Sequence, residues 1–141
     1  MDLRFTHDHV GITLAAEHLE ATIAWYRHTL DFVVLDRFEA AGSNFTFIGN
    51  GDSTIELISA GARPHPAPLA ESLPASHDTE RLHHFCLAVT DLDATVSELK
   101  RREVPIFAGP MTIDRIGRRI AFVRDNVGTV IELTQPLPSD S

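Results

Sequence analysis

Two histidines and two glutamates recur in this sequence at nearly the same interval, and their side chains are of the kinds that bind metal ions. His9 and His84 are 75 positions apart, and Glu56 and Glu132 are 76 positions apart. Each glutamate is the centre of an Ile-Glu-Leu triplet, which occurs once in each half of the chain. Because self-similarity at a fixed spacing indicates a repeated structural unit, we expect the four residues at equivalent places in two related modules.

The surroundings of these residues indicate which way their side chains point. The glutamates interrupt residues 54–58 and 130–134, which otherwise have the composition of buried strands. A carboxylate inside an apolar sheet costs free energy unless it is paired, protonated or bound to a metal. Alternate side chains of a strand face opposite sides, so His9 and His84 point away from the face that their apolar neighbours form. A pseudo-twofold relation between the modules would bring two imidazoles and two carboxylates to one point.

Neutral imidazole and carboxylate ligands suit a hard or borderline divalent cation such as Zn, Ni, Co, Mn or Fe. We therefore expect one such cation to be bound by His9, Glu56, His84 and Glu132. In an octahedral shell these four ligands leave two positions for water or substrate oxygens, which is typical of a catalytic site. His7 shares the face of His9 and is the alternative ligand there.

Each half of the chain shows the same order of predicted elements, a strand, a helix and then three short strands. Thr90, with Asp93 three residues later, resembles a capping box and predicts that the second helix starts there. Apolar residues at helical spacing predict the two helices: Leu19, Ile23, Tyr26 and Leu30 in the first half, and Leu92, Val96 and Leu99 in the second.

The length of 141 residues corresponds to one domain. Within residues 1–141 we expect module 1 over about 5–60, a linker over about 61–80, module 2 over about 81–135 and a C-terminal tail over 136–141. The linker is predicted from its prolines, which remove backbone hydrogen-bond donors. We interpret it as a plain connection, with a flap over a pocket as the alternative.

Composition excludes several classes of function. Twelve Lys and Arg against twenty Asp and Glu give a net charge of −8, which repels phosphate backbones, so no nucleic-acid partner is expected. No apolar run approaches the roughly 18 residues of a membrane span, and the start has no apolar signal core, so we expect no membrane partner and a cytoplasmic location. Cys86 is the only cysteine, which excludes a thiolate-rich zinc site, and it is expected to pack as a small apolar residue.

At these residues the sequence resembles the vicinal oxygen chelate superfamily, which includes glyoxalase I, methylmalonyl-CoA epimerase, extradiol dioxygenases, and fosfomycin and bleomycin resistance proteins. The likeness spans nearly the whole chain. It is carried by Asp8-His9-Val10, by residues 26–32, by Leu82-His83-His84-Phe85 with residues 89–92, and by residues 122–133.

The resemblance implies an α+β fold of two tandem βαβββ modules whose curved mixed sheets enclose a metal site. It implies a small-molecule substrate with vicinal oxygens, a homodimer, and a glutamate that moves a proton beside a metal-chelated carbonyl through an enediolate or enolate. Carried over to this chain, Glu132 is the catalytic base and Glu56 the second candidate. A carboxylate at position 56 resembles glyoxalase I (lactoylglutathione lyase), which makes a metal-dependent lyase or isomerase the leading hypothesis.

Other functions within the same superfamily remain alternatives. Residues 82–84 and 131–135 resemble an acyl-CoA epimerase of the methylmalonyl-CoA type. An Fe(II) extradiol-type dioxygenase and a non-catalytic small-molecule or antibiotic-binding protein are the other two. His83 is interpreted as a structural residue or as a hydrogen-bonding residue at the rim of the site. Phe45 and Phe47 fit the wall of an apolar pocket and the core equally well. Three arginines are interpreted as a solvated face, with a grip on an anionic substrate as the alternative: Arg37, Arg118 and Arg119.

Overall fold

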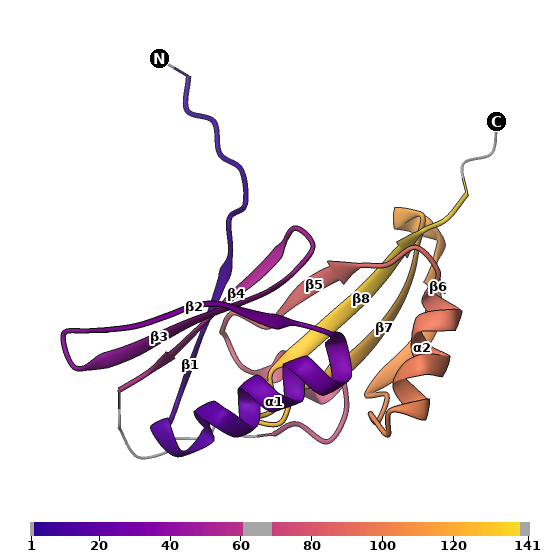
Figure 1. Ribbon diagram of the computed structural model, residues 1–141. Helices are drawn as coiled ribbons and strands as arrows, with labels where there is room; N and C mark the ends of the chain where they lie inside the picture. The colour runs from indigo at the N-terminus through magenta and orange to yellow at the C-terminus, as the bar shows by residue number, and fades with distance from the viewer. Residues whose placement is uncertain (1, 61–68, 139–141) are drawn as a thin grey trace. The chain divides into compact units, whose positions relative to one another are not determined.

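The computed structural model describes residues 2–60 and 69–138 and divides into two compact units, one ending at residue 65 and the other beginning at residue 66 (Figure 1). The predictions for residues 61–68 of the linker and 139–141 of the tail lie outside the described residues.

Unit 1 is a four-stranded mixed sheet with one α-helix. The strands lie in the order β1-β4-β3-β2, with β1 parallel to β4 and the other neighbours antiparallel. Its elements are β1 (Val10–Leu14), the 3-10 helix η1 (Ala16–His18), α1 (Leu19–Leu30), β2 (Val33–Ala40), β3 (Ser43–Asn50) and β4 (Ser53–Ser59).

Unit 2 repeats this topology, with strand order β5-β8-β7-β6 and β5 parallel to β8. The predicted tandem βαβββ fold is therefore confirmed. The elements of unit 2 are η2 (Pro74–Asp78), β5 (His84–Ala88), α2 (Leu92–Arg101), β6 (Ala108–Ile113), η3 (Asp114–Ile116), β7 (Arg118–Arg124) and β8 (Val130–Pro136). None of the helices within residues 2–60 and 69–138 is long and apolar enough to cross a membrane.

The apolar periodicity correctly predicted which side chains the helices bury. A helix is stabilised in a domain mainly by burying one apolar face against its neighbours. Helix α2 does so against β6, β7 and β8, and α1 contacts β2. The buried apolar side chains are Leu19, Ile23 and Tyr26 of α1, and Leu92, Val96 and Leu99 of α2, whereas Leu30 at the end of α1 is half-buried.

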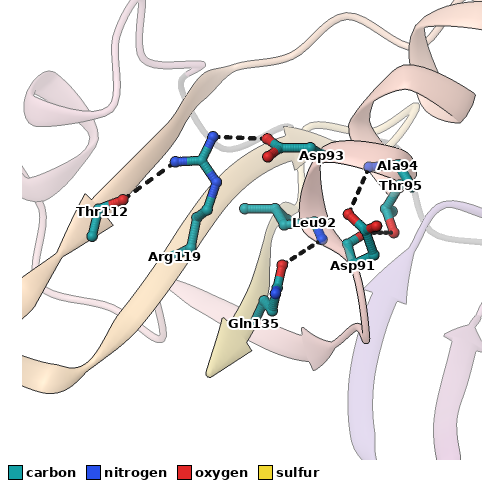
Figure 2. Close-up of polar contacts among 8 residues, drawn as sticks. All are labelled: Asp91, Leu92, Asp93, Ala94, Thr95, Thr112, Arg119 and Gln135. Atoms are coloured by element: carbon teal, nitrogen blue, oxygen red, sulfur yellow. Dashed lines mark hydrogen bonds and ion pairs between the residues drawn. The ribbon is translucent and has the colours of Figure 1, made fainter. Parts of the chain in front are cut away.

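Helix α2 begins one residue later than the sequence motif predicted. The N-cap is Asp91 and not Thr90, because the Asp91 carboxylate accepts a hydrogen bond of 3.0 Å from the backbone N–H of Ala94 (Figure 2). The Asp91 carbonyl also accepts a hydrogen bond of 2.8 Å from the Thr95 hydroxyl. The backbone of Asp91 is extended, which is the conformation that lets an N-cap side chain reach back to the first turn.

Two side chains of the sheet hold this helix end in place. Gln135 of β8 accepts a hydrogen bond of 2.7 Å from the backbone N–H of Leu92, which satisfies another free donor of the first turn (Figure 2). Arg119 of β7 forms an ion pair of 2.7 Å with Asp93. It also donates a hydrogen bond of 3.3 Å to the hydroxyl of Thr112 on β6. Arg119 therefore ties the helix to the sheet.

Replacement of the cap tests this assignment. Asp91→Ala removes the acceptor for the Ala94 N–H, so we expect a loss of about 1 kcal/mol in the free energy of unfolding. Thr90→Ala is the matched control and should change the free energy by less than about 0.5 kcal/mol. Urea denaturation of the two variants checks this. A larger loss for Thr90→Ala than for Asp91→Ala would show that the cap is assigned wrongly.

Candidate metal centre

Each unit places one predicted histidine beside one predicted glutamate. In unit 1, His9 directly precedes β1, and Glu56 lies in β4, the parallel neighbour of β1. His9 Nε2 is 3.7 Å from Glu56 Oε2. In unit 2, His84 opens β5, Glu132 lies in its parallel neighbour β8, and the corresponding distance is again 3.7 Å. The repeat therefore produces the same imidazole–carboxylate pair twice.

The burial pattern of β4 and β8 explains why both carboxylates lie on the face of their histidine. The flanking Ile55, Leu57, Ile131 and Leu133 are buried, whereas the glutamate side chains are 18% and 20% exposed. Strand alternation sends the apolar neighbours into the core and the glutamate to the opposite side. The apolar side chains thus fix the direction of each carboxylate.

The separation of 3.7 Å is too long for a direct hydrogen bond, which usually joins N and O at about 2.7–3.2 Å. It is short enough for a shared ion, because two metal–ligand bonds of about 2.1 Å can span up to about 4.2 Å. Each pair therefore has the donor chemistry and the spacing of half of a metal site.

A phenylalanine packs edge-on against each of the two imidazoles. Phe47 of β3 lies opposite Glu56 in the sheet register and contacts the His9 ring at a centroid distance of 5.6 Å. Phe122 of β7 lies opposite Glu132 and contacts the His84 ring at 5.7 Å. The role of Phe122 was missed from the sequence, although it lies 75 positions after Phe47, so the repeat spacing could have found it.

The second ring nitrogen of each histidine is also engaged, but by different groups. His9 Nδ1 lies 2.6 Å from the carboxylate of Asp8. Because a carboxylate only accepts, the imidazole Nδ1 carries the hydrogen, and a neutral His9 ring has its lone pair on Nε2, which faces Glu56. His84 Nδ1 lies 2.8 Å from Nδ1 of His83. Such contacts orient metal-binding histidines.

The surroundings of His83 favour the neutral form of its ring. Burial lowers its pKa from the usual value, and the neighbouring His84, His77 and Arg81 lower it further. The sequence predicts a structural or hydrogen-bonding role for His83, and its position just before β5 places it at the ring of His84.

Cys86 adjoins the glutamate of the second pair, at the register position opposite Glu132. Burial of the sulfur raises the pKa of the thiol to about 12, and the hydrogen bond to the Glu132 carboxylate and its negative charge add to the rise. The thiol therefore stays protonated and donates to Glu132.

The remaining sequence-predicted residues lie elsewhere. His7 is exposed, and among the described residues it is His9 whose ring faces Glu56. Arg37 is paired with Glu20, and Arg119 with Asp93, so both are engaged in ion pairs. Phe45 and Phe38 stack on each other with a centroid distance of 5.3 Å.

Within the part of either unit that the structure describes, no three His, Cys, Asp or Glu side chains form a group that could hold an ion by themselves. Each unit supplies a pair of donors. The convergence of both pairs on one cation stays a prediction.

The duplicated βαβββ topology, with an imidazole–carboxylate pair on equivalent strands of each copy, is the arrangement of a tandem-module protein of the kind that the sequence resembles. The family profile of the Glyoxalase/Bleomycin resistance protein/Dioxygenase superfamily matches residues 6–133, and the chain belongs to this superfamily.

Relatives within the superfamily differ in what they do. The human mitochondrial methylmalonyl-CoA epimerase is 25% identical over 128 residues, which cover 88% of this chain and 71% of that protein. A glyoxylase/bleomycin resistance protein/dioxygenase domain from Frankia sp. EAN1pec has a TM-score of 0.74 at 17% identity, covering 98% of this chain and 96% of the other. TnmS3, an antibiotic binding protein from Streptomyces sp. CB03234, has a TM-score of 0.68 at 20% identity, covering 96% and 99%. The two solved structures support the fold.

The protonation of Cys86 can be tested by alkylation of metal-free protein with iodoacetamide at pH 9. With a pKa of about 12, roughly a thousandth of the thiol is ionised at this pH, so alkylation should be over a hundredfold slower than that of free cysteine. Glu132→Gln removes the negative charge that disfavours the thiolate, which lowers the pKa and should accelerate the reaction. Glu39→Gln on β2 is the control. Alkylation of the unmodified protein at the rate of free cysteine would contradict the assignment.

Proposed function

We propose that this protein is a divalent-metal-dependent isomerase or lyase that moves a proton on the carbon next to a carbonyl group. The observation that carries the proposal is the imidazole–carboxylate pair, repeated in both units with the same separation of 3.7 Å. The proposed ligands are His9, Glu56, His84 and Glu132.

The chemistry of the pairs supports a bound cation. In unit 1 the lone pair of His9 Nε2 faces the Glu56 carboxylate, so two hydrogen-bond acceptors face each other without a hydrogen between them. Among the described residues none donates a hydrogen bond to the Glu56 carboxylate. A cation of the Zn, Ni, Co, Mn or Fe type satisfies both acceptors. Such an ion, when bound, polarises a substrate oxygen and stabilises negative charge that develops there.

The surroundings of Glu132 fit it to accept and return a proton. Its side chain is 20% exposed, and it lies opposite the buried Phe122 in the strand register. Ile120, Phe122 and Val130 form an apolar cluster with further side chains around it. A carboxylate that is partly shielded from water removes a proton from carbon more effectively than one in bulk water. Glu56, with similar exposure, is the second candidate for the base.

The substrate class follows from two separate observations. The relationship to methylmalonyl-CoA epimerase favours a 2-substituted acyl-CoA thioester, epimerised at the carbon beside its carbonyl. The glutamate at position 56, in contrast, favours a glyoxalase I-type reaction on a glutathione hemithioacetal. Both reactions require removal of a proton next to a carbonyl or its equivalent, so one site chemistry serves either. We further propose that the protein acts as a homodimer.

Metal analysis tests the site. The protein purified without added metal and then dialysed against Co²⁺ is expected to hold one ion per chain. At a Co²⁺ concentration 100 times the dissociation constant, binding should stabilise the fold by about 2.7 kcal/mol. Elemental analysis and thermal denaturation, before and after chelation, provide the measurements. A protein that takes up no divalent ion would overturn the proposal, and unchanged thermal stability after chelation would favour a binding protein without metal.

Replacement of the base tests the chemistry. Glu132→Gln keeps the shape of the side chain but removes the proton acceptor, and should lower turnover by about 10²–10⁴-fold without unfolding the protein. Turnover is measured as deuterium incorporation from heavy water into methylmalonyl-CoA and into the product formed from methylglyoxal and glutathione. Glu39→Gln, an exposed residue of β2, is the control. Incorporation into only one of the two compounds identifies the substrate class, and incorporation into neither contradicts the proposal.

A further inference from the structure

We propose that Ser76 and His83 are positioning residues for the metal centre, an inference that rests on the proposed function. A chain of hydrogen bonds runs from Ser76 through His83 to His84. It holds the His84 ring with its hydrogen on Nδ1 and its lone pair on Nε2, the atom that faces Glu132. We call this set of three residues the Ser76–His83–His84 relay.

The direction of each bond follows from counting hydrogens, beginning at Ser76. Its hydroxyl has one hydrogen, which is donated to the backbone carbonyl of Leu73. The carbonyl can only accept. The Ser76 oxygen must therefore accept in its second contact, the one of 2.7 Å to His83 Nε2. The hydrogen of the His83 ring is consequently on Nε2.

The same counting of hydrogens determines which ring nitrogen of His84 carries the hydrogen. A neutral His83 ring with its hydrogen on Nε2 has a lone pair on Nδ1, and can only accept there. In the contact of 2.8 Å between the two Nδ1 atoms, His84 is then the donor. The neutral His84 ring keeps its lone pair on Nε2, 3.7 Å from Glu132 Oε2. The reverse direction would put a hydrogen on Nε2 and block the atom that has to bind the metal.

The segment that carries Ser76 is fastened to unit 2 at three points. Leu73 packs against the apolar cluster of Ile120, Phe122 and Val130. The carbonyl of Ala70 accepts a hydrogen bond of 2.9 Å from Arg124 Nη1. Leu69 lies so close to Gly128 that a Cβ there would come within 2.2 Å of its side chain. Because these contacts hold η2 against the sheet, the Ser76 hydroxyl has a defined position beside His83.

In unit 1 a single residue, Asp8, determines which nitrogen of the histidine ring carries the hydrogen. Asp8 precedes His9 as His83 precedes His84, and the two residues are 75 positions apart, the spacing of the histidines themselves. The Asp8 carboxylate can only accept, so it fixes the His9 ring without help. His83 can donate or accept at Nδ1, and its hydrogen bond with Ser76 determines which of the two occurs. This contrast gives the relay a direct test.

The first measurement uses metal-free protein at pH 8, where an ordinary histidine is neutral. Nitrogen chemical shifts in a sample labelled at histidine report which ring nitrogen carries the hydrogen, and His84→Gln assigns the signal. The wild type should show His84 with its hydrogen on Nδ1. Ser76→Ala should give a mixture of the two forms. Ser72→Ala removes another hydroxyl of the same turn, which accepts from the Ala75 N–H, and should leave His84 unchanged.

The second measurement is the affinity for Co²⁺ by calorimetry. Replacement of groups that orient a metal-binding histidine typically lowers metal affinity about 10- to 100-fold, so Ser76→Ala is expected to bind Co²⁺ about tenfold more weakly. Ser72→Ala should bind as the wild type does. Unchanged affinity and an unchanged His84 ring in Ser76→Ala would together overturn the proposal.

The third measurement introduces into unit 2 the carboxylate that precedes the histidine in unit 1. His83→Asp places a carboxylate before His84, as Asp8 stands before His9, and should hold the His84 hydrogen on Nδ1 by itself. In this background, adding Ser76→Ala should change neither the ring nor the Co²⁺ affinity. An equal loss with and without His83→Asp would show that Ser76 acts only on the fold, and would overturn the relay. A wild type that shows the expected ring but binds no Co²⁺ would instead overturn the proposed function and leave the hydrogen-bond chain supported.

Discussion

The structure depends on a carboxylate that the sheet itself forces to face an imidazole nitrogen. Between two buried apolar side chains, Glu56 has no direction available except the opposite face, and Glu132 is placed in the same way. The parallel pairing of the first and last strands of each unit then sets a histidine beside each glutamate. The core that stabilises the fold and the geometry of the donor pairs therefore come from the same alternation of side chains.

The sequence predicted the elements and the faces well because both follow from local periodicity and from the repeat. It failed at the start of α2, where Thr90 and Asp91 are both good caps and only the extended backbone of Asp91 decides between them. The position of Ser76 was beyond prediction, since η2 is held by contacts with distant residues and not by a pattern of its own. Asp8 and Phe122, by contrast, were accessible from the 75-residue spacing alone.

The two units build their donor pairs from the same strands but hold the histidines differently. The Asp8 carboxylate places a negative charge next to the His9 ring, whereas the His84 ring has the neutral His83 ring as its partner. Since a charged acceptor makes an imidazole a stronger ligand, the two donor pairs are chemically unequal although their separations are the same. Glu132, with the thiol of Cys86 beside it, lies in the unit with the weaker histidine.

The close approach of Leu69 to Gly128 has a consequence for anyone who wants to recombine the halves of this protein. The repeat in the sequence points to a cut for a chimera just before β5, where the second copy begins. A transplant cut at that point would leave behind Leu69, the carbonyl of Ala70 and the whole of η2, all of which belong structurally to the second half. The transferable piece starts at Leu69, and a side chain at position 128 would require the Leu69 side chain to move and would strain a backbone with a φ of 90°.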